Sequence, residues 1–135
     1  MNRGKILVFR GTDHVKKETF FRPLGGGVEF NETSENALIR EIQEELGLEI
    51  RELQYLGTLE NIFVYQGKPG HEVVLIYDAQ FVDPKVYAEI NLHCVESDGE
   101  DLPCEWLGLE EVERQHLKLY PNGLYPLLMK KFNQQ

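Results

Sequence analysis

The sequence predicts a single α+β domain over residues 1–135, in which helices enclose a mixed β-sheet. The chain has 41% hydrophobic and 27% charged positions, an ordinary composition for one globular domain of this length. Segments rich in aliphatic and aromatic residues flank amphipathic segments, but the two kinds do not alternate regularly as in a β-α-β repeat. We therefore expect an α/β/α sandwich around a mixed sheet.

The N-terminal half contains two strand signals and the strongest helix signal. Residues 5–10 are rich in aliphatic side chains and predict a strand, and residues 28–30 predict a short one. The three glycines at 25–27 indicate a backbone that turns sharply or lies close to another group. Residues 33–46 repeat aliphatic side chains every four positions, which predicts a helix with its first residue as N-cap and Gly47 as C-cap.

The C-terminal half predicts a β-hairpin followed by shorter elements. Residues 53–65 and 72–82 are β-rich, and residues 66–71 between them have the glycine and proline content of a long hairpin loop. The other predicted elements are a polar turn at residues 98–101, a short strand at 104–107, and helices at 109–115 and 124–132, which a breaker at 120–123 separates.

The charge balance limits the classes of partner. With 14 Lys and Arg against 23 Asp and Glu, the formal net charge is -9, which opposes nonspecific binding to nucleic acid or anionic lipid. A polyanionic ligand would need a cation between it and the protein. The apolar runs fall far short of the ~20 residues that span a bilayer. We therefore expect no nucleic acid and no membrane partner.

The N-terminus and the cysteines predict the compartment. The first residues lead into only a short apolar stretch, so the pattern of a secretory signal is absent and a cytoplasmic location is expected. Cys94 and Cys104 lack a C-x-x-C pair and lack a histidine at zinc-site spacing. We expect them to be two reduced thiols without a disulfide, a metal or a function.

Three glutamates share one face of the predicted helix. Glu41, Glu44 and Glu45 are i, i+3 and i+4 neighbours, which places them within an arc of about 100°. Like-charged neighbours destabilise a helix by a few tenths of a kcal/mol each, and Mg²⁺ or Mn²⁺ compensates such a cluster well. One carboxylate of the set could also take a proton from a metal-bound water. The alternative is a solvated acidic face without function.

The order of residues around this helix favours the functional interpretation. The helix and the loop before it contain seven residues in one particular order and spacing, with aliphatic residues at 42 and 48. The seven are Gly26, Glu32, Arg40, Glu41, Glu44, Glu45 and Gly47. Seven such letters arise by chance about once in 10⁸ start positions at average residue usage. The pattern matches the Nudix box at residues 26–48, and the chain resembles the Nudix hydrolase superfamily, whose members are similar in size.

The resemblance implies a fold and a metal site. A Nudix fold is a mixed sheet sandwiched between helices, with the box as a loop-helix-loop. In Nudix enzymes the carboxylates at the positions of Glu41, Glu44 and Glu45 hold Mg²⁺ or Mn²⁺, and a carbonyl at the position of Gly25 or Gly26 often joins them.

The resemblance also implies a scaffold pair and a general base. The Glu32 position commonly pairs with the arginine matched here by Arg40. Glu41 stands at the position of the general base in some members, whereas others use a carboxylate from a later loop. Glu100 stands where such a late carboxylate is expected, and Glu105 is the reserve candidate.

The expected function is that of a metal-dependent pyrophosphohydrolase. Its substrate would be a nucleoside diphosphate derivative: a nucleotide sugar, a dinucleoside polyphosphate or a nucleoside triphosphate. Arg22 is the candidate for a phosphate contact, and Gly26 and Tyr65 are the other candidates for substrate binding. The alternative is a Nudix-like module that senses a nucleotide without cleaving it.

The chain departs from the family pattern at three places. Leu24 replaces a frequent proline, and Asn31 replaces a frequent glycine. Only four residues precede the first predicted strand, so a strand usual in the family is shortened or missing. Either the fold manages without that strand, or the chain is shortened, or a second copy covers the exposed sheet edge as a homodimer.

Overall fold

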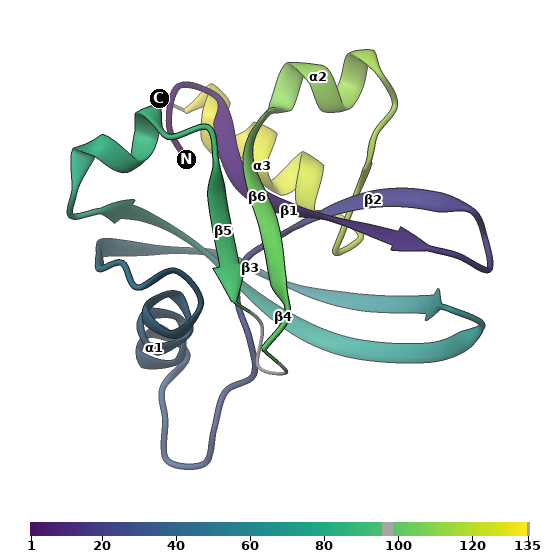
Figure 1. Ribbon diagram of the computed structural model, residues 1–135, viewed down its shortest axis with the longest axis horizontal. Helices are drawn as coiled ribbons and strands as arrows, with labels where there is room; N and C mark the ends of the chain where they lie inside the picture. The colour runs from purple at the N-terminus through teal and green to yellow at the C-terminus, as the bar shows by residue number, and fades with distance from the viewer. Residues whose placement is uncertain (96–98, 135) are drawn as a thin grey trace.

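The computed structural model describes residues 1–95 and 99–134. In these ranges the strands are β1 (Lys5–Asp13), β2 (Glu18–Pro23), β3 (Ile50–Tyr65), β4 (Lys68–Phe81), β5 (Leu92–Val95), β6 (Asp101–Gly108) and β7 (Lys118–Leu119). The helices are α1 (Ser34–Leu46), the 3-10 helix η1 (Pro84–Ala88), α2 (Leu109–Arg114) and α3 (Leu124–Asn133). The α1 helix lies on one side of the strands, and α2 and α3 lie on the other (Figure 1). This arrangement confirms the α+β class.

The strands form two sheets. One is five-stranded in the order β5-β6-β1-β2-β7, and the other is the β3–β4 hairpin. The pairing of β2 with β7 is parallel and the other pairings are antiparallel, so the larger sheet is mixed as predicted. Strand β1 lies between β6 and β2, and its Val8 is fully buried. Within the described residues, β1 is therefore paired on both of its sides.

The box helix has the predicted caps. The hydroxyl of Thr33 accepts a hydrogen bond from the N–H of Asn36, and Gly47 has a φ of 68° and donates its N–H to the carbonyl of Gln43. The helix buries Ala37 and Ile42. This match confirms the strongest element of the sequence prediction.

Two local expectations were wrong. Residues 28–30 form no strand, and Phe30 there is 94% exposed, because this segment is part of the loop that enters α1. The expected long loop at 66–71 is a tight turn, since Tyr65 pairs with Lys68 across it. Gln66 and Gly67 both have positive φ, the backbone conformation that a two-residue hairpin turn requires. The sequence analysis also missed β2, η1, β5 and β7.

The prediction of two reduced cysteines was also wrong. Cys94 and Cys104 form a disulfide between the adjacent strands β5 and β6, and both residues are buried. In the register of this pair, Cys104 lies opposite Leu92, which makes the two cysteines diagonal neighbours with Cα atoms 6.3 Å apart. Without the register, the spacing of ten residues gave no sign of this bond. Of the expected polar turn, Asp98 lies outside the described residues.

The main core joins the larger sheet to β4, α2 and α3. Its buried members are Ile6, Val8, Phe21, Ile76, Leu107, Leu109, Val112, Leu124 and Leu128. This core holds β1 and β2 in place and leaves the loop before α1 and the far end of the β3–β4 hairpin at the surface. Within residues 1–95 and 99–134, the helices are too short or too polar to cross a membrane.

Candidate functional site

Arg40 is the hub of an ionic network at the start of the box. Its Nε and Nη2 donate to the two carboxylate oxygens of Glu32 at 2.7 and 2.9 Å, and Nη2 also donates to the carbonyl of Gly27 at 2.9 Å. Its Nη1 donates to Glu41 Oε1 at 2.9 Å and to Glu44 Oε2 at 3.2 Å. One guanidinium therefore ties the loop before α1 to two carboxylates on the helix.

The two hydrogen bonds between Arg40 and Glu32 shift the pKa of both side chains. Hydrogen bonds from Arg40 lower the pKa of Glu32 from 4.5 to about 2, and the N–H of Glu29 adds to this effect. The same hydrogen bonds raise the pKa of Arg40 above its usual range. Asn31, beside this pair, has a φ of 65°, a left-handed conformation that asparagine tolerates and that explains the glycine frequent at this position. Arg40 and Glu32 thus form the ion pair that the resemblance implied.

Glu41 packs against the glycine-rich loop. A Cβ atom on Gly26 would lie 2.2 Å from Glu41 Cδ, closer than any side chain permits. A Cβ on the next residue, Gly27, would meet nothing within 4 Å. The side chain of Glu41 is only 17% exposed. Glycine at position 26 is thus required so that this carboxylate can lie against the backbone.

The three candidate metal ligands differ in their surroundings. The carboxylate of Glu44 is 58% exposed, whereas Glu45 is a buried residue with 6% exposure. Among the described residues, no group of three acidic, histidine or cysteine side chains gathers in a metal-binding arrangement. However, Glu41 and Glu44 both accept a hydrogen bond from Nη1 of Arg40, so two carboxylate oxygens converge on one cationic group. This donor set fits Mg²⁺ or Mn²⁺ chemically.

The late carboxylates lie on or next to β6. Glu105 is on β6 and pairs with Arg10 of β1 at 3.2 Å. Glu100 is exposed and immediately precedes this strand. Glu105 is thus engaged in a strand-to-strand ion pair, and Glu100 lies just before the first residue of β6.

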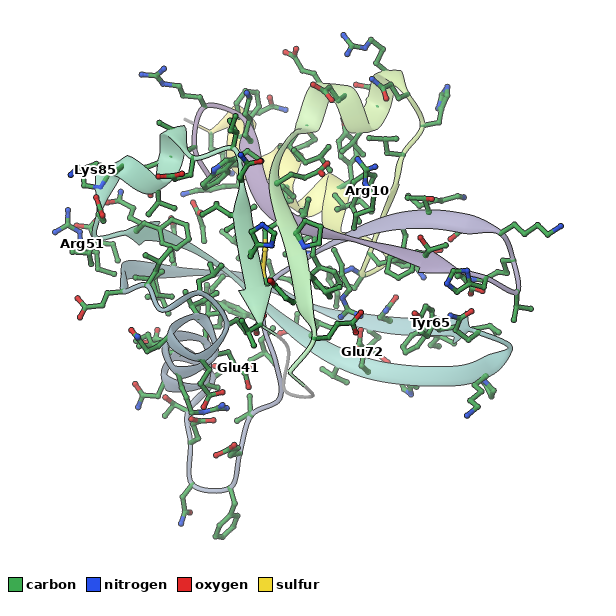
Figure 2. All side chains as sticks on the ribbon, in the orientation of Figure 1. Arg10, Glu41, Arg51, Tyr65, Glu72 and Lys85 are labelled. Carbon is green, nitrogen blue, oxygen red and sulfur yellow. A yellow bond between two sulfur atoms is a disulfide. The ribbon has the colours of Figure 1, made fainter. Side chains whose placement is uncertain are left out.

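Two cavities meet at Arg22. A cavity of about 850 Å³ is lined by the glycines of the box loop and by Arg22 and Glu72. A smaller one, of about 250 Å³, is lined by Arg22, Asn61 and Tyr65. Figure 2 shows Glu41 on α1, and Tyr65 and Glu72 on the β3–β4 hairpin. The structure therefore brings Arg22 and Tyr65, two of the predicted substrate contacts, to one cavity, and Gly26 to the adjoining one.

The structure adds two residues that the sequence analysis did not select. Glu72 Oε1 accepts hydrogen bonds from Arg22 Nη2 at 3.2 Å and from Asn61 Nδ2 at 3.0 Å. Asn61 is only 3% exposed, and its Oδ1 accepts from the N–H of Asn122 at 3.1 Å. In the sequence, these residues are ordinary polar positions of a hairpin and a turn. Only the polar residues within the β-rich segments offered a signal, and it was weak.

Sequence comparisons relate the chain to proteins of known families. A family model described as the NUDIX domain matches residues 1–128. A protein of Mus musculus named oxidized purine nucleoside triphosphate hydrolase is 27% identical over 109 residues, which cover 79% of this chain and 61% of that relative. The chain thus spans about three-fifths of the length of this curated relative.

Solved structures share the fold. The structure of the Escherichia coli ORF135 protein superposes with a TM-score of 0.52 at 23% identity and covers 95% of this chain and 79% of that one. A structure described as MutT from Aliivibrio salmonicida and Vibrio cholerae superposes with a TM-score of 0.52 at 20% identity, covering 99% and 90% of the two chains. These likenesses establish the architecture.

Proposed function

The chain belongs to the Nudix family, and from this premise we propose that it is a metal-dependent pyrophosphohydrolase acting on a nucleoside diphosphate derivative. The observation that carries the proposal is the convergence of Glu41 and Glu44 on one nitrogen of Arg40, with Glu41 packed against Gly26. A sensing module that does not cleave its ligand would have no need of this carboxylate set, and every fixed position of the box is intact.

The proposed metal ligands are the carboxylates of Glu41, Glu44 and Glu45, with a carbonyl of Gly25 or Gly26. These groups would hold Mg²⁺ or Mn²⁺, and the ion would supply neutralisation of phosphate charge and a lower pKa for a water bound to it. Arg40 keeps Glu41 and Glu44 aligned, because its Nη1 donates to both. Its fork with Glu32 fixes the guanidinium itself, so the carboxylates are oriented before substrate arrives.

The proposed reaction is attack of water on a phosphorus atom of the diphosphate. A bond forms between the water oxygen and phosphorus, and the bond from phosphorus to the bridging oxygen breaks. The electron pair of that bond leaves with the departing phosphate, and a carboxylate takes the proton of the water. Glu41 is the first candidate for this base, because it lies against the loop that lines the larger cavity. Glu100 is the second candidate.

The proposed substrate is a nucleoside triphosphate, a nucleotide sugar or a dinucleoside polyphosphate. Arg22, Gly26 and Tyr65 are the proposed contacts, since they line the two adjoining cavities. The name of the mouse relative adds oxidised purine nucleoside triphosphates to the compounds worth testing.

A nucleotide panel tests the proposal. Release of phosphate and nucleotide is measured for each compound class with Mg²⁺, with Mn²⁺ and with a chelator. We expect cleavage of one class that the chelator abolishes and that added metal restores. Absence of cleavage across the panel, or cleavage that persists in chelator, would contradict the proposal.

A further inference from the structure

The smaller cavity has mainly aromatic side chains along one part of its wall. It lies between the β1–β2 pair and the far end of the β3–β4 hairpin, and its wall includes Phe20, Phe63, Tyr65 and Tyr120. Phe20 meets the rings of Tyr65 and Tyr120 edge to face, with centroids 5.8 and 5.7 Å away. A volume of about 250 Å³ suits a single heteroaromatic ring system, and aromatic walls favour stacking of a nucleobase.

Hydrogen bonds between four segments of the chain hold the polar side chains at one end of this cavity. Arg22 of β2, Asn61 of β3, Glu72 of β4 and Asn122 before α3 form one chain of hydrogen bonds. Because Asn61 is buried and uses both ends of its amide, it holds Glu72 in one position. Glu72 in turn holds Arg22, so the guanidinium is oriented before any ligand binds.

The guanidinium of Arg22 keeps unused hydrogen-bonding capacity. Its contact to Glu72 uses one hydrogen of Nη2, and it makes no other hydrogen bond within residues 1–95 and 99–134. A guanidinium presents two forked edges, and Nη2 contributes one hydrogen to each. One complete edge with two N–H donors therefore remains available, and Arg22 lines the aromatic cavity.

Two parallel N–H donors match the O6 and N7 acceptors of guanine. This pairing is the commonest specific contact of arginine with a base, and adenine places an amino group where guanine has O6. A guanine oxidised at C8 carries a hydrogen on N7, so it also loses one of the two acceptors. The match therefore discriminates against both adenine and oxidised guanine.

We propose that the cavity between the two hairpins binds the base of the substrate. In this proposal Arg22, held by Glu72 and Asn61, selects an unoxidised guanine instead of making the phosphate contact that the sequence suggested. This inference rests on the proposed function, because it specifies the nucleoside of that substrate. Since Arg22 also lines the larger cavity, a base in the smaller one leaves its phosphates on the side of the glycine loop.

Calorimetric titration with nucleoside monophosphates tests the proposal without requiring hydrolysis, because these compounds lack a diphosphate linkage. We expect the protein to bind GMP about tenfold more tightly than AMP and than 8-oxo-GMP. Arg22→Lys keeps the charge but loses the fork, so its GMP to AMP affinity ratio should fall to near one. Glu72→Gln should lower the same ratio, because it removes the ion pair that holds the guanidinium of Arg22 in place.

Arg10→Lys is the matched control, since Arg10 lies on the neighbouring strand, is exposed and does not line this cavity. It should keep the ratio of the unmodified protein. Equal affinities for GMP and AMP, absence of GMP binding, or a ratio unchanged by Arg22→Lys would overturn the proposal. Guanine preference in a protein that cleaves nothing would contradict only the proposed hydrolysis, whereas cleavage without base preference would contradict only this inference.

Discussion

The box helix and the cavity between the hairpins use similar interactions but are built in different ways. In the box, Arg40 reaches carboxylates that are one, four and eight residues away. In the cavity, Arg22 and Glu72 are 50 residues apart, and Asn61 and Asn122 are 61 apart. The proposed phosphate site is thus local in sequence, whereas the proposed site for the base is assembled by the tertiary fold. Substitutions can alter the second without disturbing the first.

The largest expected effect is at the acidic helix. Glu44→Gln should lower kcat by about 100-fold or more, because a carboxamide is a poor ligand for Mg²⁺. The exposed position of Glu44 means that the melting temperature should stay nearly unchanged. Steady-state kinetics and circular dichroism check both expectations. Glu35→Gln on the exposed first turn is the control, and full activity of Glu44→Gln would remove this carboxylate from the site.

The glycine loop offers a pair of neighbouring substitutions with opposite expectations. Gly26→Ala should lower kcat/KM by about tenfold to 100-fold, because its Cβ would displace the Glu41 carboxylate. Gly27→Ala should have little effect, since its Cβ meets nothing within 4 Å. Kinetics of the two variants side by side make the test. Equal activities would show that the approach of Glu41 to the loop has no role in turnover.

Substitutions in the wall of the smaller cavity should change KM and leave kcat nearly unchanged. Tyr65→Ala removes a ring from the wall and should raise KM by about tenfold, since stacking contributes about 1–3 kcal/mol per base. Tyr65→Phe keeps the ring and should behave nearly as the unmodified protein. Initial rates over a range of substrate concentrations separate the two constants. A fall in kcat without a change in KM would place Tyr65 outside substrate binding.

The smallest expected effect is on acid stability. The pKa of Glu32 is about 2 in the folded protein and 4.5 ordinarily, so folding favours its charged form. The resulting stabilisation is present above pH 4.5 and is lost as the pH falls toward about 2. Glu32→Gln should therefore destabilise the protein at neutral pH, and the difference should shrink in acid. Urea unfolding across this pH range measures it, and a difference independent of pH would contradict the account.

The sequence alone was sufficient for the box helix and its caps. Thr33, Gly47 and the repeat of aliphatic residues are local signals, and the structure places each as expected. The turn at Gln66 and Gly67 was misjudged because Pro69 and Gly70, which follow it, suggested a longer loop, although both lie within β4. Composition could not distinguish these two possibilities.

The other features that the sequence did not predict depend on how the strands pair and pack. The disulfide between Cys94 and Cys104 follows from how β5 pairs with β6, and the contacts of Glu72 follow from how β2, β3 and β4 meet. Neither arrangement has a signature in the spacing of residues. The candidate cavity could therefore be found only after the strands were placed.

The most direct test of the central claim is a titration with Mn²⁺, followed by electron paramagnetic resonance, on the unmodified protein and on a Glu41→Gln, Glu44→Gln double variant. Hydrolysis of the best nucleotide is measured in the same samples. We predict that the unmodified protein binds Mn²⁺ and that the double variant loses both Mn²⁺ binding and hydrolysis while keeping its fold. Unchanged Mn²⁺ binding by the double variant, or hydrolysis without bound metal, would contradict the account.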